Sequence, residues 1–320
     1  MAERHQRGAG GQAGLRGARR MKAGFVGLGV MGAHMAENLA RAGHAVIGTD
    51  LRKVEVAGVR WAASAAEAAA EADVVFTSLP GPKEVEALAP KLGDALPKGA
   101  AWFDLTTNSP ACVRRVHAQL KTLGVDFLDA PVSGGKAGAQ SGRLAIWVGG
   151  DEAVYRRFEP MLRAIGDQPF YVGPIGAGSI AKLAHNCASF TVQTALAEIF
   201  TLGVKAGVEP LALFQALRHG ATGRKRTFDR LAEQYLPGAY DPPTFAARLA
   251  HKDLSLALEL AREVGVPMQV AERAFADFSE ALKRGWGERD SRTPMLLQNE
   301  RAGVDPHVPA AKLREVLEKG

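Results

Sequence analysis

A lysine and an asparagine stand four residues apart at the start of a long apolar segment. Lys182 and Asn186 lie within GAGSIAKLAHN, residues 176–186, and no Asp, Glu, Lys or Arg follows Lys182 until Glu198. Because four residues make about one helical turn, an amine and a carboxamide would project side by side from one helix. That arrangement, next to a glycine-rich stretch, is typical of a ligand-binding site.

Lys182 is the residue that we expect to carry a proton. Oxidation of a hydroxyl-bearing carbon removes a hydride from the carbon and a proton from the oxygen, so an acid or base must stand at that oxygen. An ordinary lysine is charged near neutral pH and suits reduction as an acid, whereas oxidation would need burial and nearby cations to favour its neutral form. Asn186 can donate and accept hydrogen bonds and would orient the lysine or the substrate hydroxyl. His185 lies about 100° away around the helix and is assigned to packing.

A second set of residues that could do chemistry is Ser133, Gly134 and Gly135, which end the segment DAPVSGG. They are predicted to form a turn after a strand, where a hydroxyl and successive backbone N–H groups make a small anion-binding concavity. We expect a substrate carboxylate to bind there. The alternative is a loop serine beside flexible glycines.

A glycine motif near the beginning of the chain predicts a dinucleotide site. Gly27, Gly29 and Gly32 make G-x-G-x-x-G at the end of a predicted strand and the start of a predicted helix, which is the context that the motif requires. The first glycine would permit a tight turn, the second would let backbone approach a pyrophosphate, and the third would let helix and strand pack closely. The alternative is a packing turn with no ligand. The predicted cofactor contacts are Gly27, Leu28, Gly29, Val30, Met31 and Gly32.

Asp50 bears on which dinucleotide binds. It ends the next predicted strand, 18 residues after Gly32, where the fingerprint expects an acid on the adenosine ribose. A carboxylate accepts the ribose hydroxyls of NAD but repels the 2′-phosphate of NADP, and Leu51 offers no cation. NAD is therefore predicted. Arg52 and Lys53 stand close enough to contact a phosphate, so NADP, or the use of both, stays open.

The elements that must position these residues alternate from Met21 onwards between short apolar runs and helical stretches, as in β-α-β units of a parallel sheet. After about residue 174 only helices are expected, the first from 179 to about 206. The predicted strands are 22–27, 45–49, 74–78, 101–105, 126–128, 144–148 and 170–172; predicted helices include 30–42, 64–71, 110–123, 210–218, 227–235, 245–264, 267–284 and 309–318.

The predicted fold class is thus α/β: an N-terminal Rossmann domain with a doubly wound parallel sheet, followed by an all-α C-terminal domain joined by one long helix. The domains are expected at 21–177 and 178–320, after a basic extension at 1–20. A chain of 320 residues with 47% hydrophobic residues suits two domains with full cores.

The charge is unevenly distributed and argues against nucleic acid. Residues 1–20 hold five arginines and one glutamate, so +4 of the formal +6 is there and +2 remains for the other 300 residues. That remainder is no electrostatic footprint for DNA. The glycine-rich, aperiodic start is expected to be disordered, as either a dispensable extension or a targeting segment.

No membrane span and no metal site is predicted. The best apolar candidate, from Leu183, is interrupted by His185, Asn186 and Gln193. The two cysteines, Cys112 and Cys187, form neither a metal-ligand pair nor a disulfide framework. A cytoplasmic location is expected.

Four blocks in order make the chain resemble the β-hydroxyacid dehydrogenase family, which includes 3-hydroxyisobutyrate dehydrogenase and tartronate semialdehyde reductase. They are GLGVMG at 27–32, DAPVSGG at 129–135, GAGSIAKLAHN at 176–186 and KDLSLAL at 252–258. The resemblance runs from Met21 to roughly Gly303. It implies hydride transfer between a nicotinamide cofactor and a 3-hydroxy acid, with Lys182 as general acid or base, Asn186 in support, and the carboxylate at Ser133, Gly134 and Gly135.

The resemblance implies further contacts. Thr107 is similar to a hydroxyl residue beside the nicotinamide and substrate, although it could instead cap a helix, as could Asn108 or Ser109. Lys252 and Asp253 resemble residues that close over the nicotinamide, with Phe245 as a wall for the substrate. The long helix, of about 28 residues and about 42 Å, implies a homodimer or homotetramer. Leu79 and Pro80 resemble a loop over the adenosine side of the cofactor.

Other features leave the substrate open. Trp147 stands where many relatives carry methionine, and residues 220–230 match no specificity pattern; Arg224, Lys225 and Arg226 there could meet a second substrate carboxylate or face water. The first alternative function is a reductase of 2-hydroxy-3-oxopropionate, which is tartronate semialdehyde, or of a related short aldehyde acid. The second is a non-catalytic dinucleotide-binding scaffold, which would be expected to lack Lys182.

Overall fold

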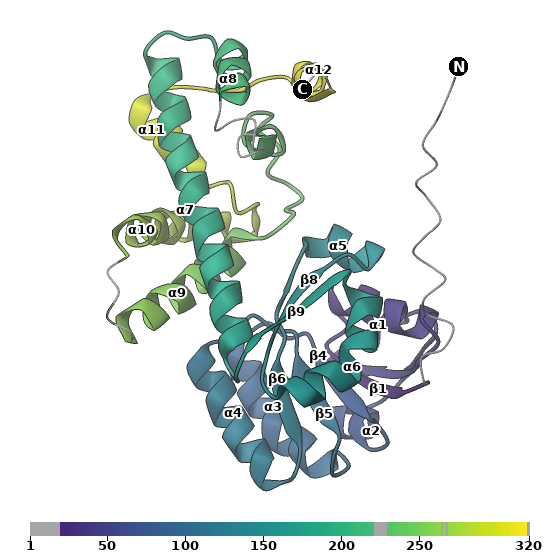
Figure 1. Ribbon diagram of the computed structural model, residues 1–320. Coiled ribbons are helices and arrows are strands. Elements are labelled where there is room, and N and C mark those ends of the chain that lie inside the picture. Colours follow the sequence, from purple (N-terminus) through teal and green to yellow (C-terminus); the bar gives the residue numbers. More distant parts are fainter. Residues whose placement is uncertain (1–19, 221–228, 264, 266–267, 319–320) are drawn as a thin grey trace, which may run out of the picture. The chain divides into compact units, whose positions relative to one another are not determined.

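The predicted sheet is present in the computed structural model, which describes residues 20–220, 229–263, 265 and 268–318 (Figure 1). The chain divides into two compact units, Met1–Lys182 and Leu183–Gly320, and each is described by itself. The predicted extension lies outside the described residues, except for the exposed Arg20. Arg224, Lys225 and Arg226 also lie outside them.

The first unit is built on a nine-stranded sheet in the order β3-β2-β1-β4-β5-β6-β8-β7, with β9 paired to β8. Neighbours from β3 to β6 are parallel, in the order of a doubly wound nucleotide-binding sheet, whereas β8 is antiparallel to β6 and β7. The strands are β1 (Lys22–Val26), β2 (Ala45–Thr49), β3 (Val59–Trp61), β4 (Val74–Thr77), β5 (Ala101–Asp104), β6 (Asp126–Asp129), β7 (Val132–Ser133), β8 (Ala145–Gly149) and β9 (Gln168–Gly173).

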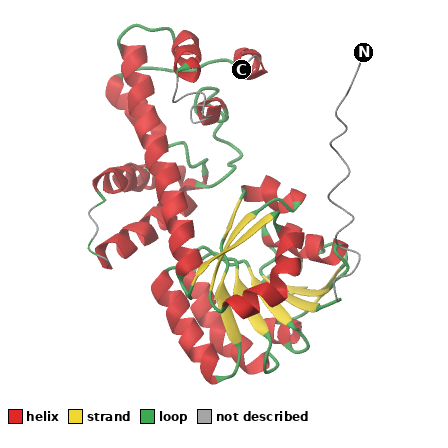
Figure 2. Ribbon diagram, viewed as in Figure 1, coloured by secondary structure: helices red, strands yellow, loops and turns green. Residues whose placement is uncertain are grey.

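Helices cover both faces of this sheet, which Figure 2 shows as strands between two layers of helix. One hydrophobic cluster joins the sheet to α1 and α6 through residues such as Met35 and Phe158, and another joins it to α3 and α4 through residues such as Leu92 and Val116. The fold class is therefore confirmed. The helices are α1 (Gly32–Arg41), α2 (Ala65–Ala69), α3 (Pro82–Ala95), α4 (Pro110–Thr122), α5 (Gly135–Ser141) and α6 (Glu152–Ile165).

Local chemistry explains where these elements begin and end. All residues of β4 and β5 are buried, as expected for central parallel strands covered on both faces. The α4 helix begins with Pro110 after Ser109, whose hydroxyl accepts a hydrogen bond from the Cys112 N–H at 3.2 Å. Since β1, β2, β4, β5 and β6 run parallel, their carboxyl ends share one edge of the sheet, where ligands bind in such folds.

The second unit is helical, and α7 (Ala177–Lys205) leads into it from the first. The only β feature among its described residues is an isolated bridge between Ala246 and Asp290. Two hydrophobic clusters hold the helices together. The remaining elements are α8 (Pro210–His219), the 3₁₀ turn η2 (Asp229–Ala232), α9 (Ala247–Glu263), α10 (Gln269–Lys283), the 3₁₀ turn η3 (Trp286–Glu288), α11 (Met295–Ala302) and α12 (Ala310–Glu318).

Some predicted elements were wrong in detail. The strands β3 and β7 were missed because three and two residues are too short to show a period. Residues 133–135 are not a free turn: Ser133 ends β7 and Gly135 begins α5. In place of a helix over 227–235, the described part contains only the 3₁₀ turn η2.

Candidate functional site

The three glycines of the first βα turn have different surroundings. Gly27 has φ 96°, and a Cβ there would lie 2.3 Å from the Ser78 carbonyl oxygen; a Cβ at Gly32 would lie 1.8 Å from the Gly27 oxygen. The protein itself therefore requires both glycines. Gly29 differs, because no heavy atom lies within 4 Å of the Cβ position. An exposed glycine that its own protein does not require leaves backbone open to a ligand, as the pyrophosphate of a dinucleotide needs.

Asp50 is held against this glycine loop. Its Oδ2 accepts a hydrogen bond from the Leu28 N–H at 2.6 Å, and its Oδ1 accepts one from the Leu51 N–H at 2.6 Å. The Leu28 side chain is buried, so what Leu28 offers a cofactor is backbone. Val30 and Leu51 are 68% and 103% exposed, and these apolar side chains flank the loop. The donors, the acid and the apolar surface fit a nucleotide.

The buried carboxylate of Asp104, which was not predicted from the sequence, connects the carboxyl ends of β4 and β5. Asp104 is fully buried and accepts hydrogen bonds from the Thr77 hydroxyl (2.8 Å), the Thr106 N–H (3.1 Å) and the Asn108 amide (3.0 Å). Burial raises the pKa of Asp104, and these donors act in the opposite direction. The signal was a strand ending in DLTTN, an acid followed closely by hydroxyl and amide side chains.

The Asp104 network fixes the loop that carries Thr107 and reaches the loop of Leu79 and Pro80. The Leu79 N–H donates to the Thr106 hydroxyl at 3.0 Å, so the ends of β4 and β5 are tied together. Thr107 is half-buried. The alternative role for Thr107 as a helix cap is not used, because Ser109 caps α4.

The predicted carboxylate-binding residues lie at the start of α5. Ser133 is half-buried and pairs with Ala145 of β8, while Gly134 and Gly135 are exposed with φ 138° and 59°. Residues that have a side chain rarely adopt these backbone φ angles, so glycine is favoured at both positions. A Cβ at Gly135 would meet no atom within 4 Å, which leaves its backbone open on that side.

A second missed carboxylate, Asp129, holds the first turn of α7. Its two oxygens accept hydrogen bonds from the Gly176 and Ser179 N–H groups, at 2.7 and 2.6 Å. Burial raises the pKa of Asp129 to about 6, against the opposing effect of these backbone donors. A Cβ at Gly178 would lie 2.3 Å from the Trp147 carbonyl oxygen, so the turn packs directly on the sheet. Asp129 thus fixes the turn from which Lys182 follows.

Lys182 and Asn186 lie one turn apart on α7, as predicted, and are only 8% and 7% exposed. The Asn186 amide donates to Asp253 Oδ2 at 2.5 Å, and Lys252 Nζ lies 3.0 Å from Asp253 Oδ1. Asp253 is 2% exposed. The helical unit therefore brings Asn186 together with Lys252 and Asp253, which follow it by 66 and 67 residues in the sequence.

The remaining two predicted side chains, Phe245 and His185, lie in different surroundings. Phe245 is half-buried and stacks on Phe190 of α7, with ring centroids 6.1 Å apart and planes 9° apart. His185 was assigned to packing, which is wrong, because it is exposed. Its rotation away from Asn186 on α7 turns it toward the outer side of the helix instead of the core.

Metal ligands, cysteines and helix hydropathy were compared with the predictions in the described part of the chain. It contains no group of three or more His, Cys, Asp or Glu residues that could hold a metal ion. Cys112 and Cys187 are buried, and burial raises the pKa of Cys112 to about 11, which disfavours the reactive thiolate. None of its helices is long and apolar enough to cross a membrane.

Family models match both units. The model of the NAD binding domain of 6-phosphogluconate dehydrogenase matches residues 22–173. The model described as NAD-binding of NADP-dependent 3-hydroxyisobutyrate dehydrogenase matches residues 176–298.

Individual proteins match over most of their length. The chain is 35% identical to 2-(hydroxymethyl)glutarate dehydrogenase of Eubacterium barkeri, over 89% of this chain and 97% of the relative. It is 36% identical to 2-hydroxy-3-oxopropionate reductase of Escherichia coli, over 84% of this chain and 94% of the relative. A solved structure of Mycobacterium tuberculosis 3-hydroxyisobutyrate dehydrogenase with L-serine is 32% identical, with TM-score 0.78, and covers 87% of this chain and 99% of that chain.

Proposed function

Because this chain belongs to the β-hydroxyacid dehydrogenase family, we propose that it transfers a hydride between a nicotinamide cofactor and a small 3-hydroxy acid of the 3-hydroxyisobutyrate type, giving the semialdehyde. It is an NAD(P)-dependent oxidoreductase that acts on hydroxy acids. The observation that carries the proposal is the buried Lys182 one turn before Asn186, in a chain with an open dinucleotide loop.

The bound dinucleotide would supply the carbon that accepts or donates the hydride. The residues proposed to hold it are the segment Gly27 to Gly32, Asp50, Leu79, Pro80, Thr107 and Lys252. We propose that NAD is preferred over NADP, because the Asp50 carboxylate would repel a 2′-phosphate. Both carboxylate oxygens of Asp50 accept hydrogen bonds from backbone N–H groups, and these bonds keep Asp50 in place beside the loop.

Lys182 is the proposed proton carrier and catalytic residue. In reduction its ammonium would give a proton to the substrate oxygen as the carbon receives the hydride, and in oxidation its amine would take that proton back. Asn186 would orient the lysine or the hydroxyl, and its amide is fixed by Asp253. Ser133 and the amides of Gly134 and Gly135 would hold the substrate carboxylate, with Phe245 and Asp253 as further substrate contacts.

The second candidate function is reduction of 2-hydroxy-3-oxopropionate or a related short aldehyde acid. It is favoured by the match to the Escherichia coli reductase of that name. Both functions use the same groups, so comparing kcat/KM for the two substrates decides between them. A non-catalytic scaffold is disfavoured, because Lys182 is retained and buried.

The test follows NADH and NADPH absorbance across a panel of 3-hydroxy acids and aldehyde acids, with the wild type and Lys182→Ala. Removing a general acid or base typically costs a factor of about 10² to 10⁴. We expect kcat to fall by that factor while the dissociation constant for NADH stays unchanged. Wild-type rates in Lys182→Ala would show that another group moves the proton.

We also propose that the protein works in the cytoplasm as a homodimer or homotetramer. Its α7 helix has 29 residues, which corresponds to about 44 Å. Large apolar side chains are exposed in the first unit, including Phe170 (64%) and Ile180 (38%). Burial of these side chains between subunits would remove their apolar surface from water.

A further inference from the structure

A pocket of about 540 Å³ in the helical unit contains none of the predicted site residues. One wall is α7 from His185 to Leu196, and the opposite wall comes from η2 and the segment that leads into α11. Its volume is in the range of small-molecule sites, which are mostly apolar with a few polar groups. The apolar part here is Val192, Leu196, Leu231 and Met295.

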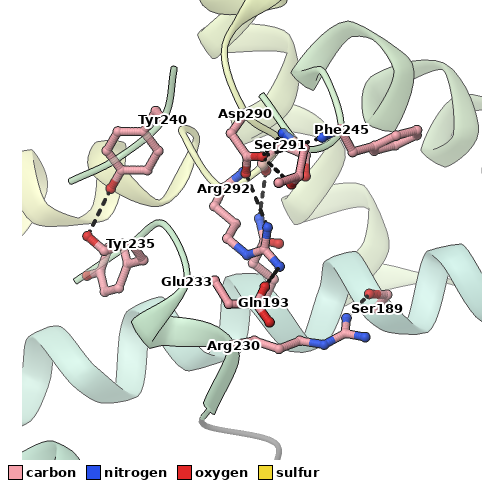
Figure 3. Close-up of polar contacts among 11 residues, drawn as sticks. Ser189, Gln193, Arg230, Glu233, Tyr235, Tyr240, Phe245, Asp290, Ser291 and Arg292 are labelled. Carbon is pink, nitrogen blue, oxygen red and sulfur yellow. Dashed lines mark hydrogen bonds and ion pairs between the residues drawn. The ribbon is translucent and has the colours of Figure 1, made fainter. Parts of the chain in front are cut away.

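Two arginines line this pocket, and they differ in whether a carboxylate of the described residues pairs with them. Arg292 is neutralised by Glu233 at 2.6 Å and by the buried Asp290 at 3.3 Å. Arg230 instead extends along α7 and donates to the Ser189 hydroxyl at 3.0 Å (Figure 3). Among the described residues no carboxylate forms an ion pair with Arg230. A guanidinium that donates one hydrogen bond and forms no ion pair within the described part of the chain is suited to bind a carboxylate.

The pocket follows the Asn186 turn along the same helix. Ser189 comes three residues after Asn186, about 4.5 Å further along the axis and about 60° around it. Gln193 comes seven residues after Asn186, on nearly the same face, and its amide is anchored by the Ser291 carbonyl at 2.7 Å. A small substrate bound at Asn186 would have the polar and apolar side chains of this pocket about one to two helical turns further along α7.

We infer that this pocket receives a second carboxylate of the substrate, bound by Arg230 and Ser189 while the aliphatic chain lies on the apolar wall. The preferred substrates are then 3-hydroxy acids with a distal carboxylate. This inference rests on the proposed function, since it extends the substrate of that same reaction. Arg230 is a specificity residue in this scheme and takes no part in proton transfer.

The experiment compares two substrates that differ only at the distal group. The dicarboxylate is 2-(hydroxymethyl)glutarate, and in 2-(hydroxymethyl)pentanoate a methyl group replaces its distal carboxylate. Each is assayed for NAD-dependent oxidation with the wild type, with Arg230→Gln, and with Arg262→Gln as control. Arg262 is an exposed arginine of α9 that does not line the pocket.

Arg230 is exposed, and an exposed ion pair is typically worth about 0.2–1 kcal/mol, a factor of roughly 1.5 to 5. We expect Arg230→Gln to raise KM for the dicarboxylate by that factor, to leave KM for the pentanoate unchanged, and to abolish the preference between them. Arg262→Gln is expected to behave as wild type. An equal response of both substrates to Arg230→Gln, or no wild-type preference for the dicarboxylate, overturns the inference. If only the pentanoate and 3-hydroxyisobutyrate are oxidised, the inference fails but the proposed function stands; if no 3-hydroxy acid reacts, the proposed function fails as well.

Discussion

At the scale of single residues, the glycines of the first βα turn separate what the fold needs from what a ligand needs. Gly27 and Gly32 are required by neighbouring backbone atoms, whereas Gly29 faces open space. The motif had predicted this division, with Gly29 as the glycine that lets backbone approach a pyrophosphate. We therefore propose that Gly29 has the ligand-dependent role.

This difference predicts opposite outcomes for two alanine variants. Gly29→Ala is expected to keep the wild-type melting temperature, since its Cβ meets no protein atom, but to raise the dissociation constant for NADH by about tenfold, or about 1.4 kcal/mol. Gly32→Ala is expected to lower the free energy of unfolding by about 1–3 kcal/mol, because its Cβ would overlap the Gly27 carbonyl. Thermal melts and fluorescence titration with NADH measure both. A destabilised Gly29→Ala protein that binds NADH normally would contradict this assignment.

At the scale of elements, α7 is set in place by a carboxylate from a distant strand. Asp129 ends β6, and its partners Gly176 and Ser179 come 47 and 50 residues later. Lys182 follows Ser179 by three residues, so the turn that Asp129 holds is next to the turn of the proposed proton carrier. We regard Asp129 as a positioning residue for Lys182.

Asp129 also predicts a pH dependence of stability. Burial raises its pKa from 3.8 to about 6, so between these values the folded protein keeps a proton that the unfolded chain releases. Its stabilising contribution is present below about pH 4 and is lost as pH rises through about 6. The free energy of unfolding of the wild type minus that of Asp129→Asn should therefore decrease as pH rises from about 4 to about 6. Urea titrations across this range measure both free energies.

The control for this prediction is Asp94→Asn, which replaces an exposed aspartate of α3. The same urea titrations measure its free energy of unfolding, so that the effect of losing an exposed carboxylate can be compared with the effect of losing Asp129. At pH 7, Asp129→Asn should also lower kcat with little change in KM for NADH, since one helix-turn acceptor is lost. A pH-independent difference between the wild type and Asp129→Asn would refute the role of this proton.

The elements differ in how far the sequence could predict them. Long apolar runs such as 74–78 and 101–105 gave the central strands, because burial on both faces leaves a continuous hydrophobic signal. The role of Asp104 could not be read in the same way, since its donor Thr77 comes from another strand. The Asn186–Asp253 bond likewise depends on how α7 and α9 pack, although the resemblance had named both residues.

At the scale of the whole molecule, the number of subunits is the property most open to test. The chain has a mass of 33.9 kDa, and we expect light scattering at micromolar concentration to give at least twice that value. Phe170→Asp and Ile180→Asp would place charges on exposed apolar positions and should reduce the measured mass if these positions are buried between subunits. A monomer mass for the wild type would defeat the proposal.

The division of the chain within α7 has a consequence for protein engineering. Lys182 is the last residue of one unit and Asn186 falls in the next, although one continuous helix carries both. A chimera that exchanges helical units between relatives at this division would join the proposed proton carrier from one parent to the proposed orienting amide from another. Crossovers placed before Ala177, which transfer α7 whole, should therefore give active hybrids more often than crossovers inside the helix.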